Sequence, residues 1–168
     1  MELRTERLTL RHPTQDDLGP LFEIMSNPAA MRFWSTLPHA SFEVTRLWLE
    51  RMIANNQSEG HQFLILLDDG IIGEVGSWRP PDFGFILHPD FWGQGIATEA
   101  ARAVIGHIFA VTDTPDLQAD VDPRNAASLH VLARLGFVET GRAANTFLLG
   151  EQWCDSIYLA LPRPHVPL

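Results

Sequence analysis

The order of apolar and polar residues in the first third of the chain predicts one strand followed by two helices. Residues 7–11 alternate at every position, which is typical of a half-buried strand. Residues 14–17 have the form of a capping box, and the helix that follows carries apolar side chains at Leu18, Leu21, Phe22 and Met25. Asn27 and Pro28 end this helix. Residues 38–41 open a second helix, whose expected inner face consists of Val44, Leu47 and Trp48.

The middle of the chain has the pattern of consecutive strands. Residues 63–67 form a short apolar run, and residues 68–70 (Asp-Asp-Gly) are typical of a hairpin turn. Residues 71–78 are then the partner strand. Residues 79–82 interrupt the pattern, and residues 83–87 are expected to form the next strand of the same sheet.

The last part of the chain predicts two helices and three strands. A helix begins near Ala97, and its apolar stripe consists of Ala97, Ala101, Val104, Ile108 and Val111. Residues 118–121 form a brief strand, and residues 125–135 form a helix closed by Gly136 as a left-handed cap. Residues 147–149 and 156–159 predict two late strands around a turn. The tail from about Pro162 is expected to be loose.

Size and composition indicate one folded domain over residues 1–168. Hydrophobic residues make up 45% of the chain and charged residues 20%, as in ordinary globular domains. Twelve Lys and Arg against 21 Asp and Glu give a net charge of −9, with no basic stripe, so we expect no nucleic-acid partner. An acidic surface suits cationic amine substrates, and it equally suits solubility alone.

Cysteine usage and hydropathy exclude several classes of protein. Cys154 is the single cysteine, so no intrachain disulfide forms, and without a nearby cysteine–histidine cluster we expect no metal site. No apolar stretch approaches the roughly 18 residues that cross a bilayer, and residues 1–7 have no signal-like run. The sequence therefore predicts a cytoplasmic protein without a membrane partner.

The sharpest chemical signal is a glycine-rich turn between a buried strand and an amphipathic helix, at residues 91–100 (FWGQGIATEA). Gly93 and Gly95 allow a tight backbone turn without side chains in the way. The free N–H groups of the following first helical turn lie at the positive end of the helix dipole. This arrangement suits an anion such as a pyrophosphate.

Two common classes of phosphate-binding turn fit poorly. A nucleotide triphosphatase loop needs Gly-Lys followed by Ser or Thr, whereas Ile96 follows Gly95 here. A dinucleotide fingerprint needs glycine or alanine where Thr98 stands, within a βαβ unit. Asp116 and Asp120 match its acidic position only loosely, and the preceding strands form a meander.

The same turn resembles the signature of the GNAT acetyltransferase superfamily, [Gln/Arg]-x-x-Gly-x-[Gly/Ala]. Gly95 and Ala97 fill the last two marked positions, while Trp92 departs from the first. The wider string at residues 87–100 is similar to the RimJ/RimL branch of ribosomal-protein N-acetyltransferases, which tolerates an aromatic residue there. The second motif of that branch is matched by residues 122–128 and 135–137, and weaker likeness at both ends extends the resemblance over nearly the whole chain.

This resemblance implies a fold and a co-substrate. The fold is a mixed α/β (α+β) sheet, the GNAT acyl-CoA N-acyltransferase fold, antiparallel in its first half and splayed where the cofactor enters. The co-substrate is acetyl-CoA, with no metal. The residues implied to hold it are the turn amides of Gly93, Gln94, Gly95, Ala97 and Thr98, the backbone of Leu87 and His88, and Asn125. Asn125 is also a good N-cap, and both roles can hold.

The resemblance also implies the catalytic groups. Many members place a tyrosine on the later helix as the acid for the leaving thiolate, but Leu132 stands there, so Ser128 becomes the candidate acid. The amine must lose a proton before or during attack. Asp82 is the candidate carboxylate, although it can equally be a turn residue, and Glu74 is a second candidate. His88 and His39 have suitable pKa values but are more often structural.

Trp34, His39 and Glu74 fall where the family builds the acceptor site. The implied acceptor is the amine of a small molecule or of a peptide or protein N-terminus, acetylated directly in a ternary complex. The protein is expected to be a monomer or homodimer. The alternative is a non-catalytic acyl-CoA sensor, since the tyrosine is absent and Trp92 departs from the signature. Binding of acetyl-CoA without turnover of any amine would identify a sensor.

Overall fold

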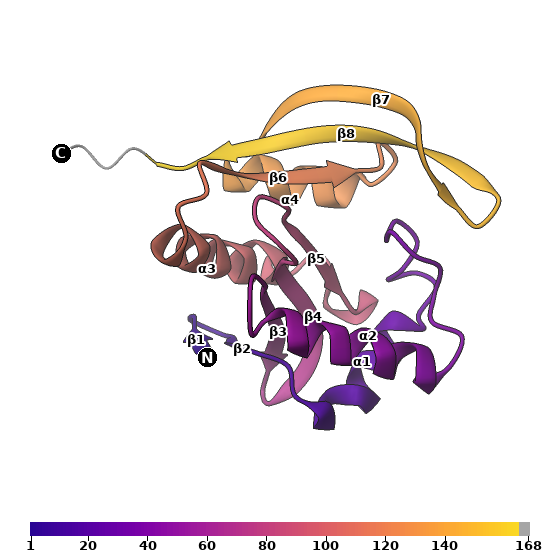
Figure 1. The fold of residues 1–168 in the computed structure, drawn as a ribbon, viewed down its shortest axis with the longest axis vertical. Helices are drawn as coiled ribbons and strands as arrows, with labels where there is room; N and C mark the ends of the chain where they lie inside the picture. The colour runs from indigo at the N-terminus through magenta and orange to yellow at the C-terminus, as the bar shows by residue number, and fades with distance from the viewer. Residues whose placement is uncertain (165–168) are drawn as a thin grey trace.

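The computed structural model describes residues 1–164, and its strands form two sheets (Figure 1). The first sheet is antiparallel and has five strands in chain order: β1 (Glu2–Arg4), β2 (Thr9–Arg11), β3 (His61–Leu67), β4 (Gly70–Ser77) and β5 (Gly84–Leu87). The predicted hairpin joins β3 to β4. Asp68 and Asp69 both have positive φ, at 47° and 64°, as a two-residue hairpin turn requires.

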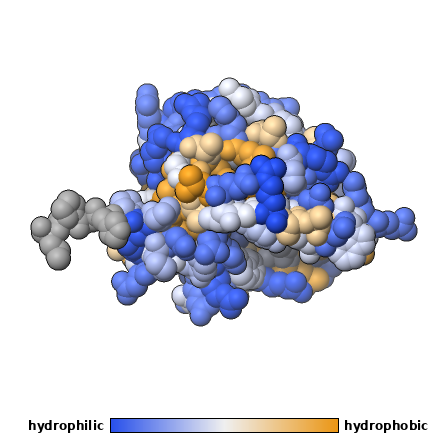
Figure 2. Space-filling view, turned by 90° about the horizontal axis from the view of Figure 1, so that it is seen from above, coloured by the Kyte–Doolittle hydropathy of each residue, from blue (hydrophilic) through white to orange (hydrophobic). Residues whose placement is uncertain are grey.

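The second sheet has three antiparallel strands in the order β6–β8–β7. They are β6 (Asp116–Val121), β7 (Val138–Leu149) and β8 (Gln152–Pro162), which lie together at the top of Figure 1. Seen from above in Figure 2, this side of the molecule carries a central hydrophobic patch surrounded by hydrophilic residues. Exposed apolar side chains on β7 and β8 include Val138, Leu148 and Trp153.

The loose tail predicted from Pro162 is wrong for its first residues. Pro162 is the last residue of β8, and the Arg163 guanidinium donates hydrogen bonds to the carbonyls of Phe109, Thr112 and Thr114, the last two at 2.6 and 2.9 Å. These carbonyls lie at and just after the end of a helix, where a cation is favourable. The remainder of the predicted tail, residues 165–168, lies outside the described residues.

The helices form two groups (Figure 1). α1 (Leu18–Met25), after the short 3₁₀ turn η1 (Gln15–Asp17), and α2 (Phe42–Asn55) pack against Leu64 and Leu66 of β3. α3 (Ile96–Val111) and α4 (Ala126–Leu135) belong to the main core, which includes Phe63 and Ile65 from the other face of β3. Among the described residues, no helix combines the length and apolar character that crossing a membrane requires.

The predicted inner face of α2 is wrong at two of its three positions, whereas Trp48, the third, packs against the apolar clusters as predicted. Val44 and Leu47 are exposed, whereas Thr45, Leu49 and Met52 are buried. The capping serine at Ser41 accepts a hydrogen bond from the backbone of Val44 and fixes the start of the helix. From that start, the tertiary contacts with α1 and β3 select the face, overriding the more apolar stripe.

The two sheets meet at a short contact and then diverge. Asp82 and Gln118 form an isolated parallel bridge; the amide of Phe83 donates to the carbonyl of Gln118 at 2.8 Å, and the amide of Gln118 donates to Pro81 at 2.7 Å. Beyond this contact, β5 pairs only with β4, and β6 pairs only with β8. We call this divergence, with Phe83 and Gln118 at its vertex, the fork. It is the splayed sheet that the sequence predicted.

Candidate active site

The glycine-rich turn has the geometry of an anion site. The short turn η2 (Pro89–Phe91) follows β5, Gly93 and Gly95 have φ of 73° and 76°, and α3 begins at Ile96 with Gly95 as its N-cap. Only glycine adopts these left-handed angles without strain. The first intrahelical bond comes from Glu99 to Gly95, so the amides of the first turn are free for an anionic ligand.

A polar clamp from the connection between β1 and β2 holds this turn in place. Arg7 donates to the carbonyl of Gln94 at 3.0 Å and to Glu99 at 2.7 Å, and the hydroxyl of Thr5 donates to Glu99 at 2.6 Å. These hydrogen bonds hold the pKa of Glu99 below its usual value against the effect of partial burial. The sequence pattern gave no signal for this clamp because its members lie about 90 residues apart.

A cavity of about 620 Å³ extends from the glycine-rich turn through the fork to the segment between α1 and α2. Its size lies in the range of small-molecule and cofactor sites. Eight of the predicted site residues line it: Trp34, Leu87, Gly93, Gly95, Ala97, Thr98, Asn125 and Ser128. The structure therefore brings together the turn, the end of β5 and the start of α4, as the resemblance implied.

Four other predicted residues do not line the cavity, and three of them hold the local structure. The ring of His88 accepts a hydrogen bond from Asp90 and caps η2, and the Gln94 side chain donates to the carbonyl of Asp90 at 3.1 Å. His39 is buried with its Nδ1 2.8 Å from the Thr45 hydroxyl, and burial lowers its pKa. Asp82 is exposed at the vertex of the fork.

Glu74, the fifth, is buried within the five-stranded sheet. Its Oε1 accepts a hydrogen bond from Gln62 at 3.0 Å, and its Oε2 has no partner among the described residues. Burial raises the pKa of Glu74 to about 7, although the bond from Gln62 opposes this. Glu74 lies directly opposite Ile86, which lines the cavity, so its carboxyl group is one strand removed from the site.

The start of α4 presents two polar groups to the cavity. Asn125 is the N-cap, and its side-chain oxygen accepts the amide of Ser128 at 3.2 Å. The Ser128 hydroxyl makes no hydrogen bond with the rest of the described chain and lines the cavity. Leu132, one turn further along, lines it too and has no proton to donate. Ser128 is therefore the hydroxyl that α4 offers to a ligand.

Trp92, which departs from the family signature, joins the turn to the end of β5. Its indole N–H donates to the carbonyl of Leu87 at 3.0 Å, and half of its side chain remains exposed. The indole and Leu87 both line the cavity. The family signature has glutamine or arginine at this position. In this chain Trp92 instead fixes the end of β5 through its hydrogen bond to Leu87.

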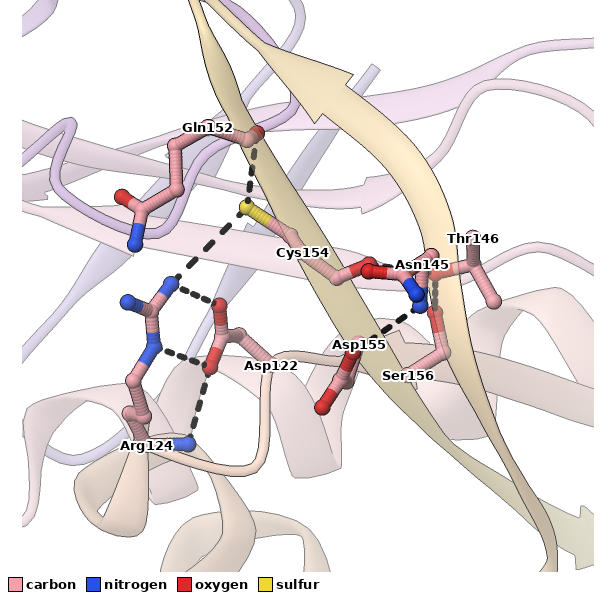
Figure 3. A network of polar contacts seen from close by, with 8 residues as sticks. All are labelled: Asp122, Arg124, Asn145, Thr146, Gln152, Cys154, Asp155 and Ser156. Atoms are coloured by element: carbon pink, nitrogen blue, oxygen red, sulfur yellow. Dashed lines mark hydrogen bonds and ion pairs between the residues drawn. The ribbon is translucent and has the colours of Figure 1, made fainter.

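A second polar cluster, drawn in Figure 3, includes Asp122, which lines the cavity. The Asp122 side chain is almost fully buried and accepts hydrogen bonds from the backbone amide, Nε and Nη2 of Arg124 at 2.9, 2.9 and 2.6 Å. Arg124 also lies 3.8 Å from the sulfur of the buried Cys154. The Phe33 ring contacts the guanidinium groups of Arg32 and Arg124, at 4.9 and 5.8 Å from its centroid.

A forked sheet with a glycine-rich turn at the start of α3 is the arrangement that the resemblance to the GNAT superfamily implies. The profile of the Acetyltransferase (GNAT) domain matches residues 7–138, which is more than half of the chain. The chain therefore belongs to the GNAT acetyltransferase family, and within it to the RimJ/RimL-like group. It is an N-acetyltransferase that uses acetyl-CoA.

Named relatives act on different amines. The chain is 27% identical over 159 residues to spermidine N(1)-acetyltransferase of Escherichia coli K12, covering 90% of this chain and 84% of that protein. It is 28% identical over 178 residues to the ribosomal protein uS5-alanine N-acetyltransferase of the same strain, covering 98% and 92%. A spermidine N-acetyltransferase from Vibrio cholerae, solved with CoA and spermine, has the same fold, with a TM-score of 0.82 at 20% identity over 95% and 97% of the two chains.

Proposed function

We propose that the protein acetylates the primary amine of a small molecule, or of a peptide or protein N-terminus, by direct transfer in a ternary complex. The observation that carries this proposal is the continuity of one cavity. It joins the phosphate-binding turn, the open edge of β5 and the aromatic segment between α1 and α2. A donor and an acceptor can therefore meet at the fork.

For the donor, the free amides of the glycine-rich turn suit the pyrophosphate of acetyl-CoA. The backbone of Leu87 and His88 is proposed to meet the pantetheine arm, but the His88 amide already donates to the carbonyl of Ile72 at 2.8 Å. The Leu87 carbonyl accepts from Trp92 and has a second lone pair available. We therefore assign the pantetheine contact to Leu87, with Asn125 on the facing helix.

For the chemistry, the amine nitrogen forms a bond to the thioester carbon while the carbon–sulfur bond breaks. A backbone amide on β5 is proposed to polarise the carbonyl oxygen, and the Ser128 hydroxyl to give its proton to the leaving thiolate. One proton of the ammonium group passes to a carboxylate before attack, and the second proton, released from the nitrogen as the amide forms, restores the Ser128 hydroxyl. Asp82 and Glu74 stay predictions for the carboxylate; both lie outside the cavity and would act through an intervening water.

A covalent acetyl-cysteine has no part in this proposal. Cys154 is buried, does not line the cavity, and contacts Arg124 at 3.8 Å on the far side of Asp122. Mass spectrometry of a single turnover is expected to find no acetylated Cys154. An acetylated thiol that forms and decays at the turnover rate would replace direct transfer with a relay.

The proposal is tested by an acetyl-transfer screen. The protein is incubated with acetyl-CoA and a panel of peptides, amino acids, polyamines and aminoglycosides, and mass spectrometry detects the gain of one acetyl group. Calorimetry measures acetyl-CoA binding in parallel. Transfer to at least one amine supports an enzyme, whereas tight binding without any transfer supports the sensor alternative.

The cellular setting belongs to the same proposal. We propose a cytoplasmic enzyme with no nucleic-acid or membrane partner, and the net charge of −9 supports the lack of a nucleic-acid partner. We propose one catalytic domain over residues 1–168, acting as a monomer or homodimer. Sedimentation of the purified protein separates these two states.

A further inference from the structure

The acceptor end of the cavity contains one carboxylate that the protein itself does not neutralise. Asp120 and Asp122 are the carboxylates that line the cavity. Asp122 is bound by Arg124 through both of its oxygens. Asp120 is exposed, and no side chain in residues 1–164 forms an ion pair or hydrogen bond with it. Asp120 is therefore the carboxylate of the cavity that is available to pair with a cationic group of a ligand.

The strand register places Asp120 at the fork on the acceptor side. Leu117, Ala119 and Val121 of β6 point into the main core, so Asp120 points to the opposite face. Two residues beyond the bridge between Asp82 and Gln118, the facing position on β5 is Gly84. A side chain at Gly84 would meet nothing within 4 Å, so the space in front of Asp120 is open.

The wall around this carboxylate is apolar. The segment between α1 and α2 contributes Phe33 and Trp34, and β5 contributes Ile86. Ala29 and Ala30 complete the wall, where Ser35 is the one polar side chain from that segment. The guanidinium group of Arg124 on the Phe33 ring is paired with Asp122, so the neighbouring cation that repels a second ammonium group is Arg32 on the same ring.

We propose that Asp120 binds the ammonium group of the acceptor, and that the acceptor is a monoamine with an apolar or aromatic body. One free carboxylate matches one ammonium group, and the aromatic wall matches the hydrocarbon attached to it. A second ammonium group would lose its hydration without gaining a partner. This inference rests on the proposed function, and it separates the chain from its spermidine-acetylating relative.

The test compares two amines of equal length that differ in one charge. Calorimetry measures the binding of hexylamine and of hexanediamine to the protein saturated with CoA. We expect hexylamine to bind at least about tenfold more tightly. Equal binding, or tighter binding of hexanediamine or spermidine, overturns the inference. Because binding is measured without turnover, this result is independent of the transfer screen, in which failure of all amines would overturn the proposed function.

Two variants test the residues. Asp120→Asn is expected to weaken hexylamine binding by about tenfold while leaving CoA binding unchanged. Asp116→Asn, on the same strand but outside the cavity, is the matched control. Ser35→Asp adds a second carboxylate at an exposed cavity position and is expected to improve hexanediamine binding selectively. Unaltered hexylamine binding in Asp120→Asn overturns the role of Asp120.

Discussion

The side chain of Glu74 is buried, and its Oε2 has no hydrogen-bond partner among the described residues. Burial of this kind disfavours the ionised form of the carboxyl group. In the folded chain its pKa is about 7, whereas the unfolded chain ionises near the ordinary value of 4.5. The protonated Glu74 therefore makes its full contribution to the free energy of unfolding below pH 4.5. This contribution is lost as the pH rises towards 7, because Glu74 releases its proton at a lower pH in the unfolded chain than in the folded one.

Replacing Glu74 by glutamine removes that loss. We expect the free energy of unfolding of Glu74→Gln to exceed that of the wild type by about 1–3 kcal/mol at pH 8 and to equal it near pH 4.5. Urea denaturation at several pH values measures the difference. Glu59→Gln, at an exposed position, is the control and should change stability at neither pH. A Glu74→Gln protein that is less stable than wild type at pH 8 contradicts the assigned cause.

Ser128 can be tested without disturbing its helix. Ser128→Ala keeps the backbone amide that Asn125 caps, so α4 should fold normally. We expect kcat to fall by about 10–100-fold while the KM for acetyl-CoA stays within about twofold, because the hydroxyl acts on the leaving thiolate. Ser128→Thr should recover part of the rate. An Ala variant with the wild-type kcat would remove Ser128 from the chemistry.

At the scale of elements, the turn before α3 depends on left-handed backbone angles. Gly95→Ala is expected to lose about 1–2 kcal/mol of stability from strain at φ 76°, since the added Cβ meets only Arg7 at 3.7 Å. Acetyl-CoA binding should weaken with it because the turn relaxes.

The matched control is Gly106→Ala, inside the same helix. A Cβ there meets nothing within 4 Å, so the substitution should stabilise α3 by about 0.5–1 kcal/mol and leave acetyl-CoA binding unchanged. Thermal unfolding and calorimetry compare both variants. Equal changes in stability and in acetyl-CoA binding at the two positions would show that the positive φ at Gly95 does not cause the expected losses.

Local signals predicted most elements. The capping box at Thr14, the Asp68–Asp69 hairpin, the Asn125 cap and the Gly136 cap are all confirmed, because each depends on residues close in sequence. The late strands are much longer than predicted. β7 contains two register shifts, one of them around Asn145 at φ 53°, which disrupt the alternation that a strand prediction needs. β1 is short and was missed.

The site was predicted only in part, for a related reason. The turn residues and Ser128 lie within motifs, so the resemblance located them. Asp120 became visible only when the fork placed it opposite Gly84, a relation between strands that spacing along the chain does not contain. Asp82, close to a motif in sequence, lies at the vertex and outside the cavity.

At the scale of the whole molecule, three histidines distant in sequence meet beside the core. The rings of His61 and His107 meet edge-on with their centroids 5.7 Å apart, and Phe63 lies between His107 and His12, with edge contacts at 5.4 and 4.8 Å. Desolvation by partial burial lowers the pKa of all three, and repulsion from neighbouring positive charges lowers His12 and His61 further. Folding therefore favours the neutral form of each ring.

This cluster predicts acid sensitivity. The unfolded chain binds protons near the ordinary pKa of 6.5, so stability from the neutral histidines is present above that pH and is lost as the pH falls below it. We expect the melting temperature to drop between pH 7 and pH 5.5 in the Glu74→Gln background, where the opposing carboxyl effect is absent. A variant with glutamine at all three histidines should show a flatter profile; an equally steep one would place the sensitivity elsewhere.

The fork has a further consequence for how the protein behaves among other copies of itself. An unpaired strand edge is normally a template for aggregation. Beyond the vertex, the facing edges of β5 and β6 are not paired with each other, and both strands line the cavity. A strand of another copy reaches such enclosed edges less easily than an edge at the outside of a sheet. The fork thus leaves two backbone edges unpaired without presenting them for self-association.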